Sequence, residues 1–130
     1  MIKISLLLIL LSLNAFSSVY DGASLFSPQS INLASKKIES IHTHCGTFIE
    51  VQTHLHPVEV KSEMPRNAVG LFFFKSSGTS QIKFGTDYRI SEKEKAILSR
   101  LIYYPRLYHQ NDRALLSSLK FLEKRCKNRE

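Results

Sequence analysis

The amino end of the chain is the feature that most constrains what it becomes. Lys3 precedes an apolar run over residues 4–13, and two small residues, Ala15 and Ser17, follow that run. A basic residue, an apolar stretch and a small-residue cleavage site are the three parts of a secretory signal peptide. A membrane anchor would need about 20 apolar residues in one helix. The sequence therefore predicts that residues 1–17 are a cleaved signal peptide.

Export also predicts where the protein works. A leucine-rich apolar stretch with a single basic residue is typical of bacterial signal peptides, so we expect a periplasmic or secreted protein. No cysteine lies near the predicted cut to carry a lipid, and no later stretch is long and apolar enough to span a membrane. The remaining residues, 18–130, have the length of one small domain.

The chain has two cysteines, Cys45 and Cys126. Exported proteins with an even number of cysteines usually pair them, so we expect one disulfide. This bridge would close most of the domain into a loop, and chain-entropy arguments limit its contribution to about 4.5 kcal/mol. A bridged Cys45 could serve neither as a catalytic thiolate nor as a metal ligand.

The first predicted helix covers residues 28–45. Ser27 can cap it, Pro28 suits the first helical position, and Gly46 can adopt the left-handed conformation that ends a helix. Between them, apolar residues recur at steps of three or four, as expected for a helix that buries one face. They are Ile31, Ala34, Ile38, Ile41 and Cys45.

The middle of the chain predicts strands. Residues 18–26 have no clear period and read as an extended arm, whereas residues 47–55 alternate between apolar and polar as a half-buried strand does. Val58 and Val60 are expected to begin a second short strand, which the turn at residues 65–67 ends. Residues 69–74 are apolar on both faces, which suits a central strand in the core, and residues 82–84 begin the returning strand of a hairpin.

Two helices are predicted to follow. Ser91 and Glu94 form a capping box, and Pro105 is expected to end that helix. The last helix begins near Asn111 and buries one apolar stripe, which consists of Leu115, Leu119, Leu122 and Cys126. The predicted fold is therefore an α+β domain with an N-terminal helix, an antiparallel sheet of about four strands, two C-terminal helices and one disulfide.

Positive charge is concentrated at the carboxyl end. Residues 89–130 hold eleven Lys or Arg against five Asp or Glu, a net charge of +6, whereas residues 18–88 hold six of each. On the last helix a basic face is predicted opposite the apolar stripe, and it consists of Arg113, Lys120, Lys124 and Lys127.

This basic face has two interpretations. It could bind a protein or an anionic component of the cell envelope, with nucleic acid the less available target for an exported protein. The nearby tyrosines and arginines would suit contact with lipid headgroups; they are Tyr103, Tyr104, Tyr108, Arg100, Arg106 and Arg113. The alternative is an ordinary solvated helix face.

Four histidines fall close together in the sequence, at positions 42, 44, 54 and 56. On a strand, His54 and His56 would point to the same side and could bind zinc or copper. His42 and His44 lie about 200° apart on a helix, so at most His42 could join them. The alternative is that these histidines decorate a solvated strand face.

No catalytic motif is recognisable in the chain, and we expect neither an enzyme nor a cofactor. The leading hypothesis is an exported binding protein that engages an anionic or protein partner through the basic face of its last helix. The second hypothesis is a periplasmic metal-binding protein that uses His54 and His56.

Overall fold

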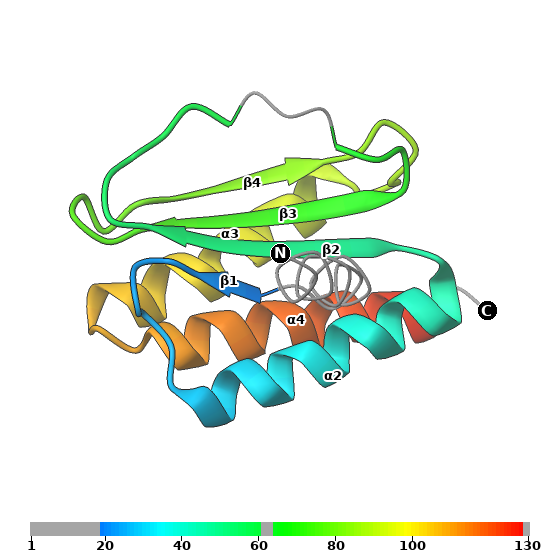
Figure 1. Cartoon of the computed structure of the whole chain (residues 1–130). Coiled ribbons are helices and arrows are strands. Elements are labelled where there is room, and N and C mark those ends of the chain that lie inside the picture. The colour runs from blue at the N-terminus through cyan, green and yellow to red at the C-terminus, as the bar shows by residue number, and fades with distance from the viewer. Residues whose placement is uncertain (1–18, 61–63, 129–130) are drawn as a thin grey trace, which may run out of the picture.

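The computed structural model describes residues 19–60 and 64–128, and within them three helices cover one face of a four-stranded sheet (Figure 1). The strands are β1 (Val19–Asp21), β2 (Phe48–His54), β3 (Ala68–Phe74) and β4 (Ser80–Phe84), and they lie in the order β1-β2-β3-β4. The helices are α2 (Pro28–Cys45), α3 (Glu92–Leu107) and α4 (Asn111–Lys127). The α+β class is confirmed.

The prediction of an antiparallel sheet is wrong, because the sheet is mixed. β1 pairs with β2 and β2 pairs with β3 in parallel, and only β3 and β4 are antiparallel. Parallel neighbours need a crossover of about a dozen residues or more. Here α2 lies in the first crossover, and the second connects β2 to β3 with no helix or strand in its described residues, 55–60 and 64–67. The periodicity of a strand carries no information on its direction, which the crossovers decide.

The membership of the sheet also differs from the prediction. Residues 57–60 and 64–67 belong to no strand, so the short strand predicted between Val58 and the turn at Pro65 is wrong where the structure describes it; residues 61–63 lie outside the described residues. The fourth strand is β1, within the arm predicted to be extended. The Asp21 carboxylate fixes the turn after β1, since it accepts hydrogen bonds from the amides of Leu25 (2.8 Å) and Phe26 (3.0 Å) and from the Thr53 hydroxyl (2.6 Å).

The core lies between the sheet and the helices. β3 is buried along its whole length, as its double-sided apolar sequence predicted. Its side chains at 69, 71 and 73 pack against the helices. On the opposite face of the strand, Met64 lies next to Gly70. The helices contribute Ala34, Ile38, Ile41, Leu98, Ile102, Ala114, Leu115, Leu119 and Leu122 to the core.

The predicted helix ends are confirmed except at Pro105. Ser27 caps α2, Gly46 ends it at φ 66°, and Ser91 and Glu94 form the capping box of α3. α3 continues past Pro105 to Leu107. Proline has no N–H, so α3 lacks one backbone hydrogen bond at Pro105, and the helix ends two residues later.

No described helix is long and apolar enough to cross a membrane. The predicted signal peptide, residues 1–17, lies outside the described residues and stays a prediction.

Candidate functional site

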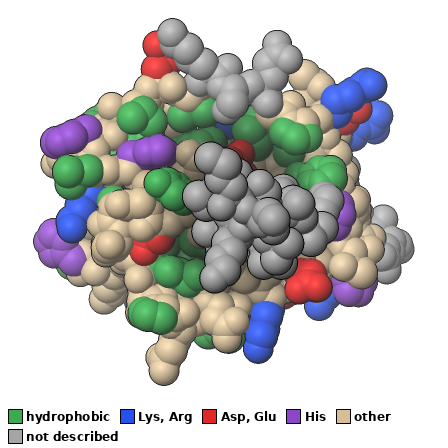
Figure 2. Space-filling model, viewed as in Figure 1, with side chains coloured by type: hydrophobic (Ala, Val, Ile, Leu, Met, Phe, Trp, Pro, Cys, Tyr) green, Lys and Arg blue, Asp and Glu red, His purple; other side chains and the backbone are tan. Residues whose placement is uncertain are grey.

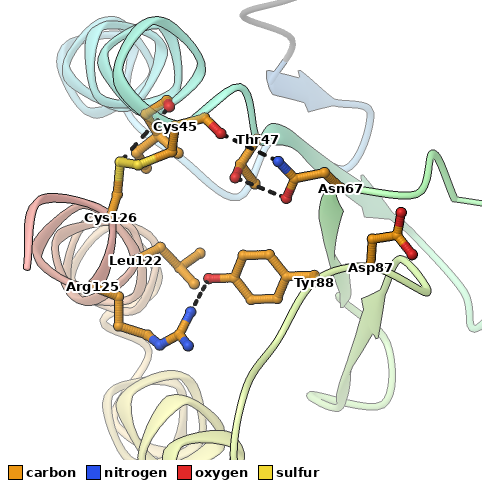
Figure 3. Close-up of a pocket in the computed structure, with 9 residues that line it drawn as sticks. Cys45, Thr47, Asn67, Asp87, Tyr88, Leu122, Arg125 and Cys126 are labelled. Atoms are coloured by element: carbon orange, nitrogen blue, oxygen red, sulfur yellow. Dashed lines mark hydrogen bonds between the residues drawn. A yellow bond between two sulfur atoms is a disulfide. The ribbon is translucent and has the colours of Figure 1, made fainter. Parts of the chain in front are cut away.

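The carboxyl ends of α2 and α4 are joined by the predicted disulfide, which is confirmed. Cys45 and Cys126 are bonded with their Cα atoms 5.9 Å apart. A hollow of about 500 Å³ opens beside the bridge (Figure 3). Its lining comes from both cysteines and from Ile41, Thr47, Asn67, Asp87, Tyr88, Leu122 and Arg125.

Side chains in this hollow are hydrogen-bonded to one another. Thr47 donates to the Asn67 side-chain oxygen (3.0 Å), and the Asn67 amide donates to the carbonyl of Cys45 (3.3 Å) (Figure 3). These bonds tie the end of α2 to the segment that enters β3. With its sulfur in a disulfide, Cys45 supplies no thiolate. We therefore interpret this hollow as a brace between helices and sheet rather than as a reactive centre.

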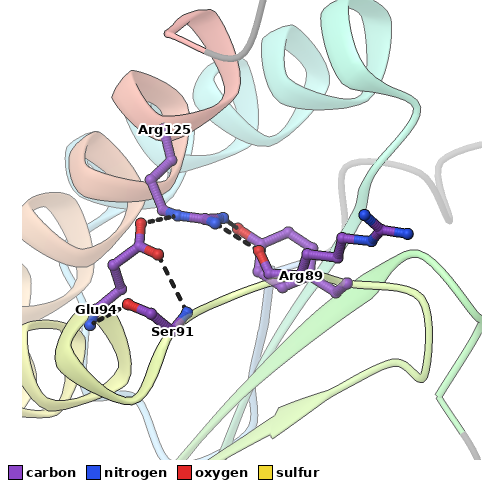
Figure 4. Close-up of polar contacts among 5 residues, drawn as sticks. Arg89, Ser91, Glu94 and Arg125 are labelled. Atoms are coloured by element: carbon purple, nitrogen blue, oxygen red, sulfur yellow. Dashed lines mark hydrogen bonds and ion pairs between the residues drawn. The ribbon is translucent and has the colours of Figure 1, made fainter.

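Arg125 is a basic residue whose guanidinium is hydrogen-bonded within the domain. Its guanidinium donates to the Glu94 carboxylate (2.5 Å), the Tyr88 hydroxyl (2.7 Å) and the carbonyl of Arg89 (Figures 3 and 4). Hydrogen bonds from Arg125 and from the Ser91 amide lower the pKa of Glu94 from 4.5 to about 2. This cluster anchors the amino end of α3 to the last turn of α4, and sequence reasoning had found only its capping box.

Arg106 is the second structural cation, and its grouping with the surface tyrosines is wrong. It is only 9% exposed, and its guanidinium donates to the carbonyls of Phe74 (3.0 Å) and Thr79 and to the Asn111 side chain (3.2 Å). Burial lowers the pKa of Arg106. The Arg106 guanidinium is thus buried against the carbonyls of the β3–β4 turn and is not available to an external partner.

The predicted basic face of α4 is a different kind of surface. Arg113, Lys120, Lys124 and Lys127 are all exposed. Within the described part of the chain none of them forms an ion pair, and Arg113 contacts only the neutral side chain of Gln110 (3.4 Å). The two acidic side chains of α4 are already engaged: Glu123 pairs with Lys37 (3.4 Å), and Asp112 accepts the Ser27 amide (2.9 Å).

The basic face continues onto α3 across a shallow hollow of about 350 Å³. Arg100 from α3 and Arg113 from α4 both line this hollow, together with Tyr104, which is 55% exposed. Its remaining lining is Ile97, Leu101, Pro105 and Ser117. Two cations thus border a partly apolar depression at the amino end of the basic face.

The structure separates His42 from His54 and His56. β2 ends at His54, so His56 lies beyond the strand, and each ring has a local contact: His54 with the Gln52 side chain (2.9 Å) and His56 with Ser76 (3.2 Å). His42 packs against Phe48, with the ring centres 4.5 Å apart and the ring planes tilted by 41°. Phe48 begins β2 and His54 ends it, so at the usual rise of a strand these two ends lie about 20 Å apart.

Figure 2 shows histidines on separate sides of the molecule. Among the described residues no group of three or more His, Cys, Asp or Glu side chains is placed to hold a metal. The zinc or copper site stays a prediction that rests on His54 and His56.

Comparison with known proteins identifies the fold but no family. No family model matches the chain, and neither does any curated protein. The N-terminal domain of a P. gingivalis protein, solved by NMR, has a TM-score of 0.65 at 18% identity over 88% of this chain and 87% of that domain.

A second NMR structure, the N-terminal domain of a Corynebacterium glutamicum protein, has a TM-score of 0.64 at 11% identity, with 82% and 77% of the two chains covered. At these identities the likeness concerns the fold alone. The chain is thus similar in fold to two bacterial N-terminal domains, and its function has to be argued from its own side chains.

Proposed function

We propose that this protein is an exported, non-enzymatic binding protein that attaches to an anionic component of the cell envelope through the basic face of α4. The observation that supports this is a difference between two sets of cations in the domain. Arg106 and Arg125 form hydrogen bonds within the domain. The four cations of the basic face are instead exposed and have no acidic partner among the described residues.

The arrangement of these cations suits a repetitive anionic surface. Residues 113, 120, 124 and 127 recur at steps of seven, four and three, so they lie in one stripe along α4. A stripe of three flexible lysines and one arginine, bordered by a shallow hollow, is suited to recognising charge rather than one small molecule. Anionic lipid and lipopolysaccharide phosphates both present such a surface to an exported protein.

The test is charge reversal of the stripe. Each lysine near an anionic membrane surface contributes about 1 kcal/mol, so three lysines account for about 3 kcal/mol, or roughly 100-fold in affinity. The triple variant Lys120→Glu, Lys124→Glu, Lys127→Glu should lose at least that factor in sedimentation with phosphatidylglycerol vesicles and with lipopolysaccharide. Phosphatidylcholine vesicles should bind neither protein.

A matched control separates the stripe from net charge. Lys36, Lys75 and Lys93 are exposed lysines elsewhere on the surface. Reversing all three changes the net charge of residues 18–130 by the same amount as the first triple variant, from +6 to 0, since each Lys→Glu substitution lowers the charge by two. This control should keep most of the binding. Equal losses in the two triple variants, or no loss in the first, would contradict the proposal.

A further inference from the structure

β4 forms an open edge of the sheet, because it pairs with β3 alone (Figure 1). The bonds at the two ends of this pair fix which way its backbone groups point. Gly85 N donates to Ala68 O (2.8 Å), and Phe74 N donates to Thr79 O (2.9 Å). In an antiparallel pair, hydrogen-bonded positions alternate with non-bonded ones. Residues 81 and 83 therefore face β3, and residues 80, 82 and 84 direct their N–H and C=O groups outward.

These outward groups have no protein partner in the part of the chain that the structure describes. Natural edges are often blocked by proline, a bulge or a lysine that projects from the strand. β4 contains no proline, and its lysine is turned onto the sheet face away from the helices, where Lys83 Nζ donates to the carbonyl of Val60 (2.9 Å). Among the described residues this edge is therefore open to another strand.

A hollow of about 440 Å³ lies alongside this edge, between β4 and α3. Its apolar lining is Ile82, Phe84, Ile102 and Tyr103, and its polar lining is Gly78, Thr79, Ser80, Lys95 and Ser99. A strand added to β4 would place alternate side chains on the helix side of the sheet, next to Ile82 and Phe84. Those side chains would enter the hollow, and apolar ones would suit its floor.

The charge at the hollow selects among possible strands. Lys95 lines it with its ammonium group 5.6 Å from the centre of the Phe84 ring, and its acidic neighbour Glu92 (3.2 Å) belongs to an exposed pair that is worth little. An incoming carboxylate would therefore be favoured. A second copy of residues 18–130 would instead bring another Lys95 and a net charge of +6 to the same place.

We propose that the free edge of β4 is a docking site for an extended segment of another protein, which adds as a fifth strand. The segment carries apolar residues at alternate positions for the hollow and an acidic residue for Lys95. Main-chain hydrogen bonds to residues 80, 82 and 84 supply affinity, and the hollow supplies selectivity, as in other cases of β-strand addition. The site is separate from the basic face of α4 and does not depend on its function.

The test starts from random peptides displayed on phage and selected on the mature protein. Selected peptides should show alternating apolar residues with an acidic residue, and in solution they should protect the amides of residues 80, 82 and 84 from hydrogen exchange. Methylating the alternate peptide amides that face β4 should weaken binding about tenfold or more, because it removes main-chain hydrogen bonds without changing the protein.

Substitutions in β4 and α3 test the same docking site from the side of the protein. Ile82→Pro removes one outward N–H and no ladder bond, so the fold should tolerate it while peptide binding falls about tenfold; Ile82→Val keeps the N–H and should bind normally. Lys95→Glu should reverse the preference for acidic peptides, and the triple reversal on α4 should leave peptide binding intact.

Three outcomes would overturn the docking site: no alternating consensus, undiminished binding of the N-methylated peptide, or protection of amides elsewhere. Concentration-dependent dimerisation that Ile82→Pro abolishes would also overturn it, since a second copy would then occupy the edge.

Discussion

Replacing Arg106 by methionine should destabilise the domain by about 2–3 kcal/mol. The guanidinium donates to two carbonyls and one side-chain oxygen and lies 5.3 Å from the centre of the Phe73 ring. Hydrogen bonds from a charged donor contribute about 1.5–3 kcal/mol each, and a cation–π contact about 1 kcal/mol. Two effects reduce the sum. Both carbonyls keep a backbone donor, from Gly78 N (3.1 Å) and Phe74 N (2.9 Å), and the variant no longer has to desolvate a charge.

The measurement is the free energy of unfolding by urea, with the melting temperature as a second readout. A loss of 2–3 kcal/mol corresponds to about 10 °C in a domain of this size. Arg100→Met is the matched control, because Arg100 is on the exposed side of the same helix and arginine and methionine have similar helix propensity. Amide exchange in the β3–β4 turn should accelerate only in the Arg106 variant. A loss below about 1 kcal/mol would refute the view that Arg106 holds this turn onto α3.

Two further stability predictions follow from the described contacts. Replacing Cys45 and Cys126 together by alanine should cost about 2–4 kcal/mol in urea unfolding, and adding reductant should bring the native protein to the same stability. Glu94 has a folded pKa of about 2, below its ordinary 4.5, so its contribution is complete above pH 4.5 and is lost as the pH falls towards 2. Because its side chain is one-third exposed, we expect about 1 kcal/mol from this effect. The difference in stability between wild type and Glu94→Gln should shrink over that pH range, and a constant difference would show that Arg125 does not set this pKa.

The helices could be predicted from the sequence because their signals are local. Ser27, Gly46 and the capping box at Ser91 each act within one turn of the residues that they cap, and the apolar steps of α2 and α4 identify the buried faces. The disulfide was predicted from the expected export and from the position of both cysteines on those faces. Local sequence signals were therefore sufficient to predict the helices and the disulfide.

Strand order and direction could not be predicted in this way, because they depend on partners far along the chain. β1 is a strand only because residues 51–53 pair with it, and a segment of three residues is too short to show the periodicity that would predict a strand. Residues 58–60 have a β-type sequence but no neighbour to pair with. Crossovers decided the parallel direction, and their path is set by tertiary packing.

The candidate site divides in the same manner. The basic face of α4 was found because helical spacing alone places its four cations together. The roles of Arg106 and Arg125 were missed because their partners are main-chain carbonyls and side chains more than twenty residues away. The open edge of β4 depends on hydrogen-bond register, which becomes visible only when the strand partners are known.

The parallel pairing of β1 with β2 has a consequence for the order in which the chain matures. Val19 pairs with Val51, α2 packs on α4, and the disulfide joins residues 81 positions apart. Contacts between such distant residues slow folding, because long loops must close before any contact is gained. A polypeptide that is threaded through a translocation pore must stay unfolded until it has crossed. In this topology the stabilising contacts are complete only after α4 has emerged, so for the export that we propose the architecture would delay folding until translocation is nearly finished.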